Sequence, residues 1–288
     1  MQTRYFIGVD GGGTQCRTRL TNQNGDVLAA CTGGPANIWS QFDNAMKQVC
    51  QLLDETLHAA GLSTCDAAQT HVVLGLAGGN ISRVRAQAQA WPHAYASWQV
   101  FSDVEIACPG AHNGQPGAVL ITGTGSQGAV WSGQAFRCVG GWGMALSDQG
   151  SGAWLGQRAL RLALKAHENL VEHTPLTRAL MAHFEHEPET LLAWSVQATP
   201  AQWGQFAPQI FQAASEQDSN GIILVAACAQ EISELINNLS QNGRYPVAML
   251  GGLALPIYPW LSADVQAMLV AAEGDALSGA LRLARLCA

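Results

Sequence analysis

The 288-residue sequence predicts an α/β fold made of two domains that face each other across a cleft. Short apolar runs typical of strands alternate with amphipathic stretches typical of helices, which is the pattern of a layered α/β structure. A glycine turn between two strand-like runs occurs twice, after residues 5–9 and after residues 118–121. Each copy opens a segment long enough for a domain, and ligands commonly bind between domains.

The first copy predicts a three-stranded unit. Residues 5–9 are apolar and end at Asp10 and three glycines. Residues 14–20 have the character of a second strand, and a turn at residues 22–25 leads into a third strand at residues 26–32.

Helices and strands alternate between the two copies. Helical periodicity covers residues 40–60 and 81–90, while strand-like runs cover residues 71–77 and a segment ending near Phe101. The second copy repeats the glycine turn at residues 123–125, followed by strands near Trp131 and through Val139.

The second half of the chain is mostly helical in pattern. Helices are expected at residues 150–168, 177–184, 203–216 and 219–239, and a late strand at residues 247–250 ends at Gly251 and Gly252. We therefore expect an N-terminal domain over residues 1–115 and a C-terminal domain with helical insertions over residues 116–274. A last helix, at about residues 275–288, is expected to pack back on the first domain.

Composition narrows the class of partner. A formal net charge of −7 and a pI near 5.5 argue against nucleic acid, which needs a basic face. Lys47 and Lys165 are the only lysines, so a bound phosphate must be met by backbone amides, an arginine or a metal ion. The eight cysteines form no CxxC pair, and the N-terminus resembles neither a signal peptide nor a membrane span. We expect reduced thiols, no membrane partner and a cytoplasmic location.

The glycine turns are candidate phosphate loops. In DGGGT, beginning at Asp10, successive backbone N–H groups of a hairpin turn can converge on an anion, although one or two glycines would serve a plain hairpin. Residues 123–128 match GxGxxG but lead into a strand, which excludes the dinucleotide-binding fold, and no P-loop is present. Two such turns could hold a polyphosphate with Mg²⁺ near Asp10; the alternative for Asp10 is a turn acid that bonds local amides.

Three further positions suit catalysis or sugar binding. Asp103 in FSDVEIA and Asp148 in SDQGSGAW each lie where a helix begins, so either could be a catalytic carboxylate or a helix cap. Asn37 and Trp39 lie on a loop, where a polar group and an aromatic plane would suit a sugar.

The ordered set of motifs resembles the BadF/BadG/BcrA/BcrD-type group of the acetate and sugar kinase, heat-shock chaperone and actin superfamily, and within it the bacterial glucosamine and N-acetylglucosamine kinases. The resemblance covers nearly the whole chain. It is carried by DGGGT, PANIW, LGLAGG, FSDVEIA, ITGTGS, GGWG, SDQGSGAW and GGLA, and by AWS and GQFAPQIF in the helical half.

The resemblance implies two actin-like (ribonuclease H-like) domains with a nucleotide cleft between them, ATP and Mg²⁺ as cofactors, and a role for each matching residue. The phosphate loops would be Gly11, Gly12, Gly13 and Thr14 in one domain and Gly123, Thr124 and Gly125 in the other. Gly251 and Gly252 would lie against the adenosine, Asp10 near the metal, and Asp103 would be the general base. The sugar site would be lined by Asn37, Gly78, Gly141, Trp142, Gly143 and Asp148.

We therefore expect an ATP-dependent kinase that phosphorylates the 6-hydroxyl of an amino sugar. Met144, Ala145 and Leu146 depart from the resembling motif, so the choice between glucosamine and N-acetylglucosamine stays open, with resemblance favouring glucosamine. Two rival functions are an ATPase activator of a radical dehydratase, against which the cysteine spacing argues, and a nucleotide-gated, sugar-sensing regulator. A homodimer through the helical half is compatible with the apolar composition.

Overall fold

The computed structural model describes residues 4–288, which fall into two compact units. Unit 1 contains the chain up to Val119 together with Ala129–Cys138 and Ala271–Ala288. Unit 2 contains Leu120–Gly128 and Val139–Val270.

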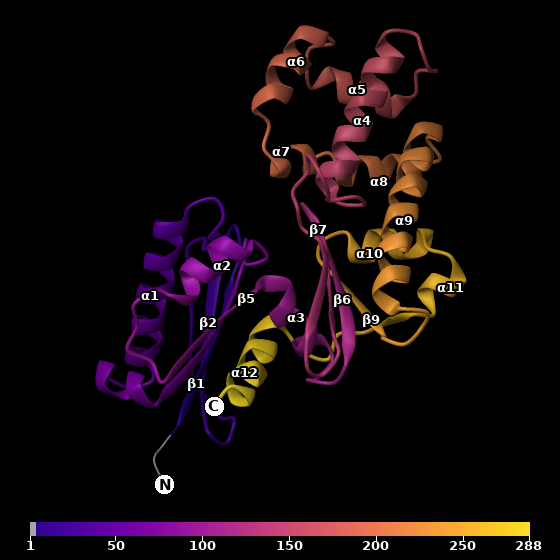
Figure 1. Cartoon of the computed structure of the whole chain (residues 1–288). Helices are drawn as coiled ribbons and strands as arrows, with labels where there is room; N and C mark the ends of the chain where they lie inside the picture. Colours follow the sequence, from indigo (N-terminus) through magenta and orange to yellow (C-terminus); the bar gives the residue numbers. More distant parts are fainter. Residues whose placement is uncertain (1–3) are drawn as a thin grey trace. The chain divides into compact units, whose positions relative to one another are not determined.

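Unit 1 is built on a five-stranded sheet of order β3-β2-β1-β4-β5 (Figure 1). The strands β1, β2 and β3 form an antiparallel meander, and β1, β4 and β5 run parallel. The bounds are β1 Tyr5–Gly11, β2 Cys16–Asn22, β3 Val27–Gly33, β4 Thr70–Leu76 and β5 Ser97–Ser102.

Helices pack on this sheet because its parallel strands β1 and β4 are mostly apolar and buried, as parallel strands usually are. The helix α1 (Phe42–Ala59) contacts β1, β2 and β3, and its buried residues join Ile7, Leu20 and Leu74 in the larger core. The helices α3 (Asp103–Ala111) and α12 (Ala276–Leu286) contact the sheet and each other around a second core with Phe6 and Ile106. The remaining helices of this unit are η1 (Thr64–Gln69) and α2 (Ser82–Gln89).

The second five-stranded sheet has the order β10-β9-β6-β7-β8. Its strands are β6 Gly117–Thr122, β7 Ser126–Trp131, β8 Phe136–Gly140, β9 Val247–Leu250 and β10 Leu269–Val270. The turn at residues 123–125 joins β6 directly to β7, so a strand follows the glycines, as the sequence predicts, and not the helix of a dinucleotide-binding fold.

Most helices of the chain lie in unit 2. They are α4 Gly152–His167, α5 Pro175–Ala182, α6 Pro188–Gln197, α7 Pro200–Gly204, α8 Ala207–Ser215, α9 Ser219–Ser240, α10 Ala254–Ile257, η2 Tyr258–Trp260 and α11 Ala263–Gln266. The single helix predicted at residues 203–216 is wrong, since the chain breaks between α7 and α8, and α6 was not predicted.

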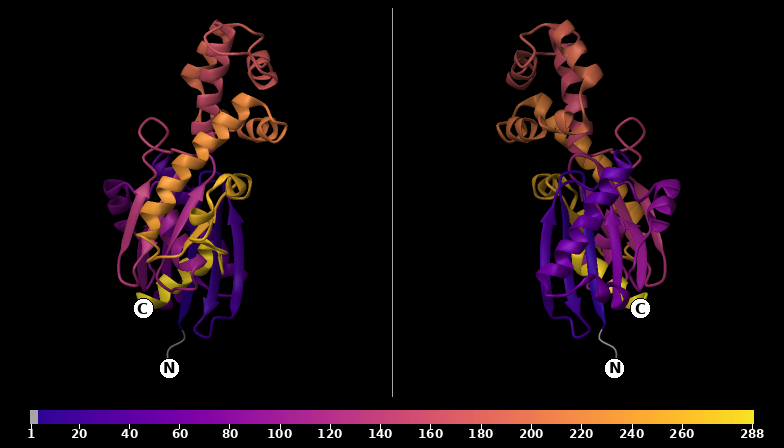
Figure 2. Two further views of the ribbon diagram at one scale, coloured as in Figure 1. Left: turned by 90° about the vertical axis from the view of Figure 1, so that its right-hand side faces the viewer. Right: turned by 90° about the vertical axis from the view of Figure 1, so that its left-hand side faces the viewer.

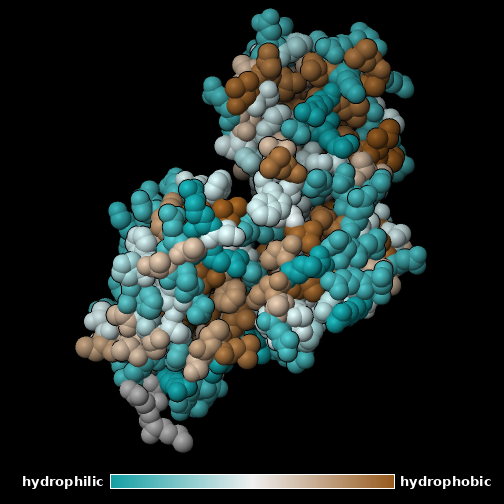
Figure 3. All heavy atoms as spheres, viewed as in Figure 1, coloured by the Kyte–Doolittle hydropathy of each residue, from teal (hydrophilic) through white to brown (hydrophobic). Residues whose placement is uncertain are grey.

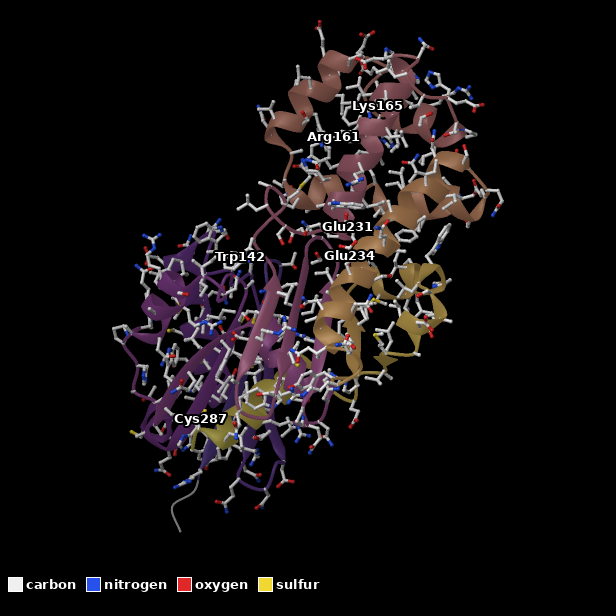
Figure 4. All side chains as sticks on the ribbon, turned by 45° about the vertical axis from the view of Figure 1, so that its right-hand side comes forward. Trp142, Arg161, Lys165, Glu231, Glu234 and Cys287 are labelled. Carbon is white, nitrogen blue, oxygen red and sulfur yellow. The ribbon has the colours of Figure 1, made fainter. Side chains whose placement is uncertain are left out.

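The helix α9 is, within residues 4–288, long and apolar enough to cross a membrane by length and composition alone (Figure 2). It packs against α4, α5, α8 and β9, and its exposed positions are mixed, with Ile223 61% exposed in the first half and Gln230, Glu234 and Asn237 exposed in the second half. Glu231 and Glu234 lie on it one turn apart (Figure 4). Apolar residues packed on the core, with polar residues on the exposed side of the second half, are typical of a core helix.

The helical segment α4–α6 exposes hydrophobic side chains. Figure 3 shows brown spheres interrupting the teal surface there. On α6, Leu192 is 64% and Val196 is 78% exposed. The homodimer expected through this half stays a prediction.

Candidate active site

One residue each of the predicted metal, sugar and catalytic sites lies at the carboxyl ends of the three parallel strands of unit 1. Asp10 lies at the end of β1, Gly78 follows β4, and Asp103 follows β5. Side chains and loops at this edge of a parallel sheet are where α/β proteins bind their ligands. The strand order therefore brings together residues that are up to 93 positions apart in the sequence.

The DGGGT turn is packed against the protein at Gly11 and Gly12 and open to solvent at Gly13 and Thr14. The Gly12 amide donates to the Gln15 carbonyl at 2.8 Å, and the Ala77 amide donates to the Gly11 carbonyl at 2.7 Å. A Cβ on Gly11 would come within 2.6 Å of the Leu76 side chain, whereas one on Gly13 would meet nothing within 4 Å. Gly11 is therefore needed for packing, while Gly13 and the exposed Thr14 are accessible to a ligand.

Asp10 is paired with an arginine. Asp10 and Arg17 are cross-strand partners in the β1–β2 hairpin, and the Arg17 guanidinium donates to Asp10 Oδ2 at 2.5 Å. In this conformation one carboxylate oxygen of Asp10 is occupied. Arg17, which the sequence analysis did not single out, is the cation nearest in sequence to the first glycine turn.

Asn37 and Gly78 form adjoining loops. Asn37 Oδ1 accepts from the amides of Trp39 at 2.9 Å and Ser40 at 3.1 Å. Its Nδ2 donates no hydrogen bond within the described residues, so that amide is free to bind a hydroxyl group. Gly78 has φ +86°, and a Cβ there would lie 2.7 Å from the Trp39 amide. Only glycine lets these loops lie this close.

Asp103 is the first residue of α3 and is half-buried. Its Oδ1 accepts from the Val104 amide at 2.9 Å. Burial raises its pKa to about 6, with the negative charge of Asp10 acting in the same direction and the Val104 amide opposing it. The helix cap is supplied by Ser102 and not by Asp103, which leaves this carboxylate available for chemistry.

In unit 2, the helix α4 fixes the second glycine turn. The amides of Gly152 and Ala153, at the N-terminus of α4, donate to the carbonyls of Gly123 at 2.8 Å and Thr124 at 3.2 Å. The first amides of a helix have no hydrogen-bond partner within the helix, and here two of them bond to the turn. The backbone of residues 123–125 is thereby fixed in a single position.

Gly251 and Gly252 lie against the same turn. Gly251 has φ +96°, and a Cβ there would come within 2.2 Å of the Thr122 carbonyl at the end of β6. Gly252 has open space around it, and its amide would be 3.9 Å from a Cβ on Gly123. The two turns that the sequence assigned to phosphate and adenosine are therefore neighbours.

A cavity of about 530 Å³ opens beside these turns, entirely within unit 2. Its wall is mostly apolar or backbone, which suits a base and ribose with phosphates toward the glycines. It is lined by Gly123, Thr124, Gly152, Ala201, Gly204, Gln205, Ala207, Pro208, Phe211, Gly252, Leu253 and Pro256. The residues from α7 and α8 were missed as site residues because the predicted helix over 203–216 hid the break that shapes the wall.

The predicted sugar-site residues of unit 2 are Asp148, which lies against the turn at residues 123–125, and residues 141–143, on the loop after β8. Asp148, buried and with φ +66°, accepts from the Ser126 amide at 3.3 Å, and burial raises its pKa. Gly141 and Gly143 also have positive φ, and Trp142 between them is 59% exposed on the loop after β8 (Figure 4). The Asp148 carboxylate therefore lies against Gly125, since a Cβ there would be 3.1 Å from both of its oxygens, whereas Trp142 lies at the surface.

Gln127 is a polar residue that sequence reasoning missed. Its Nε2 is buried and has no hydrogen-bond partner among the described residues. A Cβ on Gly141 would lie 2.7 Å from this atom. A buried amide donor without a partner, beside a glycine loop, is suited to bind an acceptor group of a ligand. The position of Gln127 within the GTGSQG motif is the sequence feature that could have identified it.

Comparison with known proteins places the chain in a family. The model of the BadF/BadG/BcrA/BcrD ATPase family matches residues 7–281. The chain belongs to this family. It is 38% identical to "Glucosamine kinase GspK" of Vibrio cholerae over 97% of this chain and 95% of that protein.

A second curated relative and a solved structure are also similar to the chain. The chain is 27% identical to "N-acetyl-D-glucosamine kinase" of Dictyostelium discoideum, covering 88% of this chain and 86% of that protein. A putative N-acetylglucosamine kinase from Chromobacterium violaceum superposes with a TM-score of 0.86 at 34% identity, covering 98% and 99% of the two chains. The α/β, actin-like fold class expected from the sequence is confirmed.

The residues present fit the nucleotide that BadF-type ATPases use. The cavity of unit 2 has the size and apolar lining for an adenosine, with the turn at residues 123–125 on its edge. Mg²⁺ is commonly held by one or two carboxylates together with phosphates and water. No group of three or more potential ligand side chains occurs within residues 4–288. Asp10, beside the first glycine turn, is the carboxylate that could share a metal ion with phosphate.

Proposed function

We propose that the chain is an ATP-dependent amino-sugar kinase that transfers the γ-phosphate of ATP to the 6-hydroxyl of glucosamine or N-acetylglucosamine. The observation that carries the proposal is Asp103: a half-buried carboxylate with a pKa of about 6, at the edge of the sheet where Asn37 offers a free amide. The names of the curated relatives support the amino sugar as substrate.

The proposed role of Asp103 is that of general base. A primary hydroxyl is a poor nucleophile at neutral pH, and a positioned carboxylate that takes its proton contributes roughly 10²- to 10⁴-fold. With a pKa of about 6, Asp103 is mostly ionised at neutral pH and still basic enough to accept a proton. Its Oδ1 accepts from the Val104 amide, and in the proposed mechanism Oδ2 faces the acceptor hydroxyl.

The other predicted residues take the supporting roles that their positions allow. The amides of the turns at residues 11–14 and 123–125 would bind the phosphates, and the cavity wall with Gly252 would bind the adenosine. Asp10 would hold Mg²⁺, which supplies charge neutralisation when bound. Asn37, Gly78, residues 141–143 and Asp148 would line the sugar site, and Gln127 joins them as a donor.

The test is ADP production with Mg·ATP and, in separate reactions, glucosamine, N-acetylglucosamine, glucose or no sugar. We expect a strong rate with one amino sugar and a 6-phosphate product identified by ³¹P–¹H NMR. Glucosamine is favoured, because the relative with the higher identity is named for it. Hydrolysis that is independent of sugar would support an ATPase activator, and binding without turnover would support a regulator.

A further inference from the structure

An ion pair between the half-buried Arg85 and the buried Glu105 connects the general base to the loop that carries Gly78. Arg85, on α2, donates through Nη1 to Glu105 Oε1 at 3.2 Å, and its Nη2 bonds Glu105 Oε2. Arg85 Nε also donates to the Gly79 carbonyl at 2.5 Å. One guanidinium therefore holds both the glycine loop and the helix of Asp103.

Glu105 in turn sets the start of that helix. Its Oε2 accepts from the Ser102 amide at 2.7 Å and from the Ser102 hydroxyl at 2.8 Å, and the Ser102 hydroxyl accepts from the Glu105 amide. This capping box fixes the residues on both sides of Asp103. Glu105 is 5% exposed, so its negative charge needs the arginine beside it.

The glycine loop fits tightly on the same strand end. A Cβ on Gly79 would lie 2.7 Å from the Phe101 carbonyl and 3.0 Å from the Ser102 Cα. Gly78 meanwhile packs on Trp39 in the Asn37 loop. A chain of contacts thus runs from Asn37 through Gly78 and Arg85 to Asp103.

We propose that Arg85 and Glu105 form a positioning pair that holds the base Asp103 in register with the acceptor loop, with Arg85 neutralising the charge of Glu105 beside it. The inference rests on the proposed function, because it assigns the pair a role in the reaction of Asp103. Arg85 supplies the bidentate geometry that a carboxylate matches, and it neutralises a buried charge two residues from the base.

The charged and titratable groups near Asp103 come from five elements. Asp10 on β1 and Glu105 on α3 both favour the protonated form of Asp103. Asp10 is paired with Arg17, and Glu105 with Arg85. Cys138 on β8 has a pKa of about 11, raised mainly by burial, and is neutral at the pH of interest. Glu105 is thus the carboxylate whose effect Arg85 controls.

The test compares single-charge changes at the two partners. In Arg85→Gln, Glu105 loses its counter-charge, so the acid limb of the kcat–pH profile should move to a pH higher by about 0.5 to 1 unit. In Glu105→Gln, which preserves the capping box, a negative charge near Asp103 is removed, so the acid limb should move to lower pH. In Arg85→Lys, which keeps the charge without the fork, the limb should stay while kcat falls about tenfold. Arg83→Gln, on the same helix, is the matched control and should behave as the wild type.

A second measurement does not depend on turnover. The pKa of the Asp103 carboxyl is followed by ¹³C NMR in each variant, its resonance being assigned by its loss in Asp103→Asn. Opposite shifts in Arg85→Gln and Glu105→Gln support the pair, whereas shifts in one direction, or none, overturn it. If the variants show these opposite shifts but the wild type phosphorylates no amino sugar, the proposed function is refuted and the Arg85–Glu105 pair is not. If Arg85→Gln does not fold, Arg85→Lys and Glu105→Gln still decide.

Discussion

Asp103 lies where ionisation of its carboxyl group is unfavourable. The carboxylate is half-buried and has Asp10 and Glu105 as negative neighbours, and its pKa of about 6 reflects this. A structural helix cap would have the opposite character, since amides that bond a carboxylate lower its pKa. Asp218, which caps α9, shows that contrast: the amides of Leu176, Asn220 and Gly221 lower its pKa despite burial.

The first prediction concerns activity. Asp103→Asn keeps the shape of the side chain but cannot accept a proton, so we expect kcat to fall by roughly 10²- to 10⁴-fold with ATP and sugar affinity retained. The wild-type kcat should decline below pH about 6 as Asp103 is protonated. Steady-state kinetics with calorimetric binding checks both; a variant with wild-type turnover would remove Asp103 from the mechanism.

The second prediction concerns stability. The pKa of Asp103 is about 6 in the folded state, above the ordinary value of 3.8. The folded state therefore binds this proton more tightly than the unfolded state does, and the free energy of unfolding falls as the pH rises from about 3.8 to about 6. Asp103→Asn should therefore raise the free energy of unfolding by about 1–2 kcal/mol at pH 8 and leave it unchanged near pH 3.5. Urea unfolding at both pH values measures this. An equal effect at both would show that ionisation of Asp103 is not the cause.

At the scale of elements, the sequence predicted the strands better than the helical half. Both glycine turns lie between paired strands, and residues 247–250 form β9 as expected. The break at Gln205 was missed because apolar periodicity continues across it, although Pro208 in the first turn of α8 marks a helix start. The pairing of Asp10 with Arg17 needed the register of the hairpin, which motif reading alone does not supply.

The third prediction uses two adjacent glycines of different character. Gly251→Ala puts a Cβ into the Thr122 carbonyl and at φ +96°, which should cost about 2 kcal/mol or more and distort the nucleotide cavity. Gly252→Ala adds a methyl group to open space. We expect Gly251→Ala to lower both Tm and ATP affinity, and Gly252→Ala to keep Tm. Equal Tm values in the two variants would contradict the assigned backbone constraint.

At the scale of the whole molecule, the end of the chain completes unit 1. The helix α12 packs on β1, β4 and α3, and its N-cap Asp275 pairs with Arg19 on β2. Arg19 and the Ser278 amide and hydroxyl lower the pKa of Asp275 to about 2, against the effect of burial. The sheet that carries Asp10 and leads into Asp103 is therefore covered by residues more than 160 positions away in sequence from either.

The last prediction tests that dependence at the α12–α3 contact. A Cβ on Gly279 would lie 1.9 Å from the Ile106 carbonyl and 2.6 Å from the Gly110 amide, so Gly279→Ala must push α12 away from α3. Because α3 begins at Asp103, we expect a loss of about 2–3 kcal/mol of stability together with a fall in kcat. Leu286→Ala, on the same helix at a site that is 73% exposed, is the control and should change neither. Calorimetry and kinetics on both variants decide, and a Gly279→Ala protein with normal Tm would show that the close contact is dispensable.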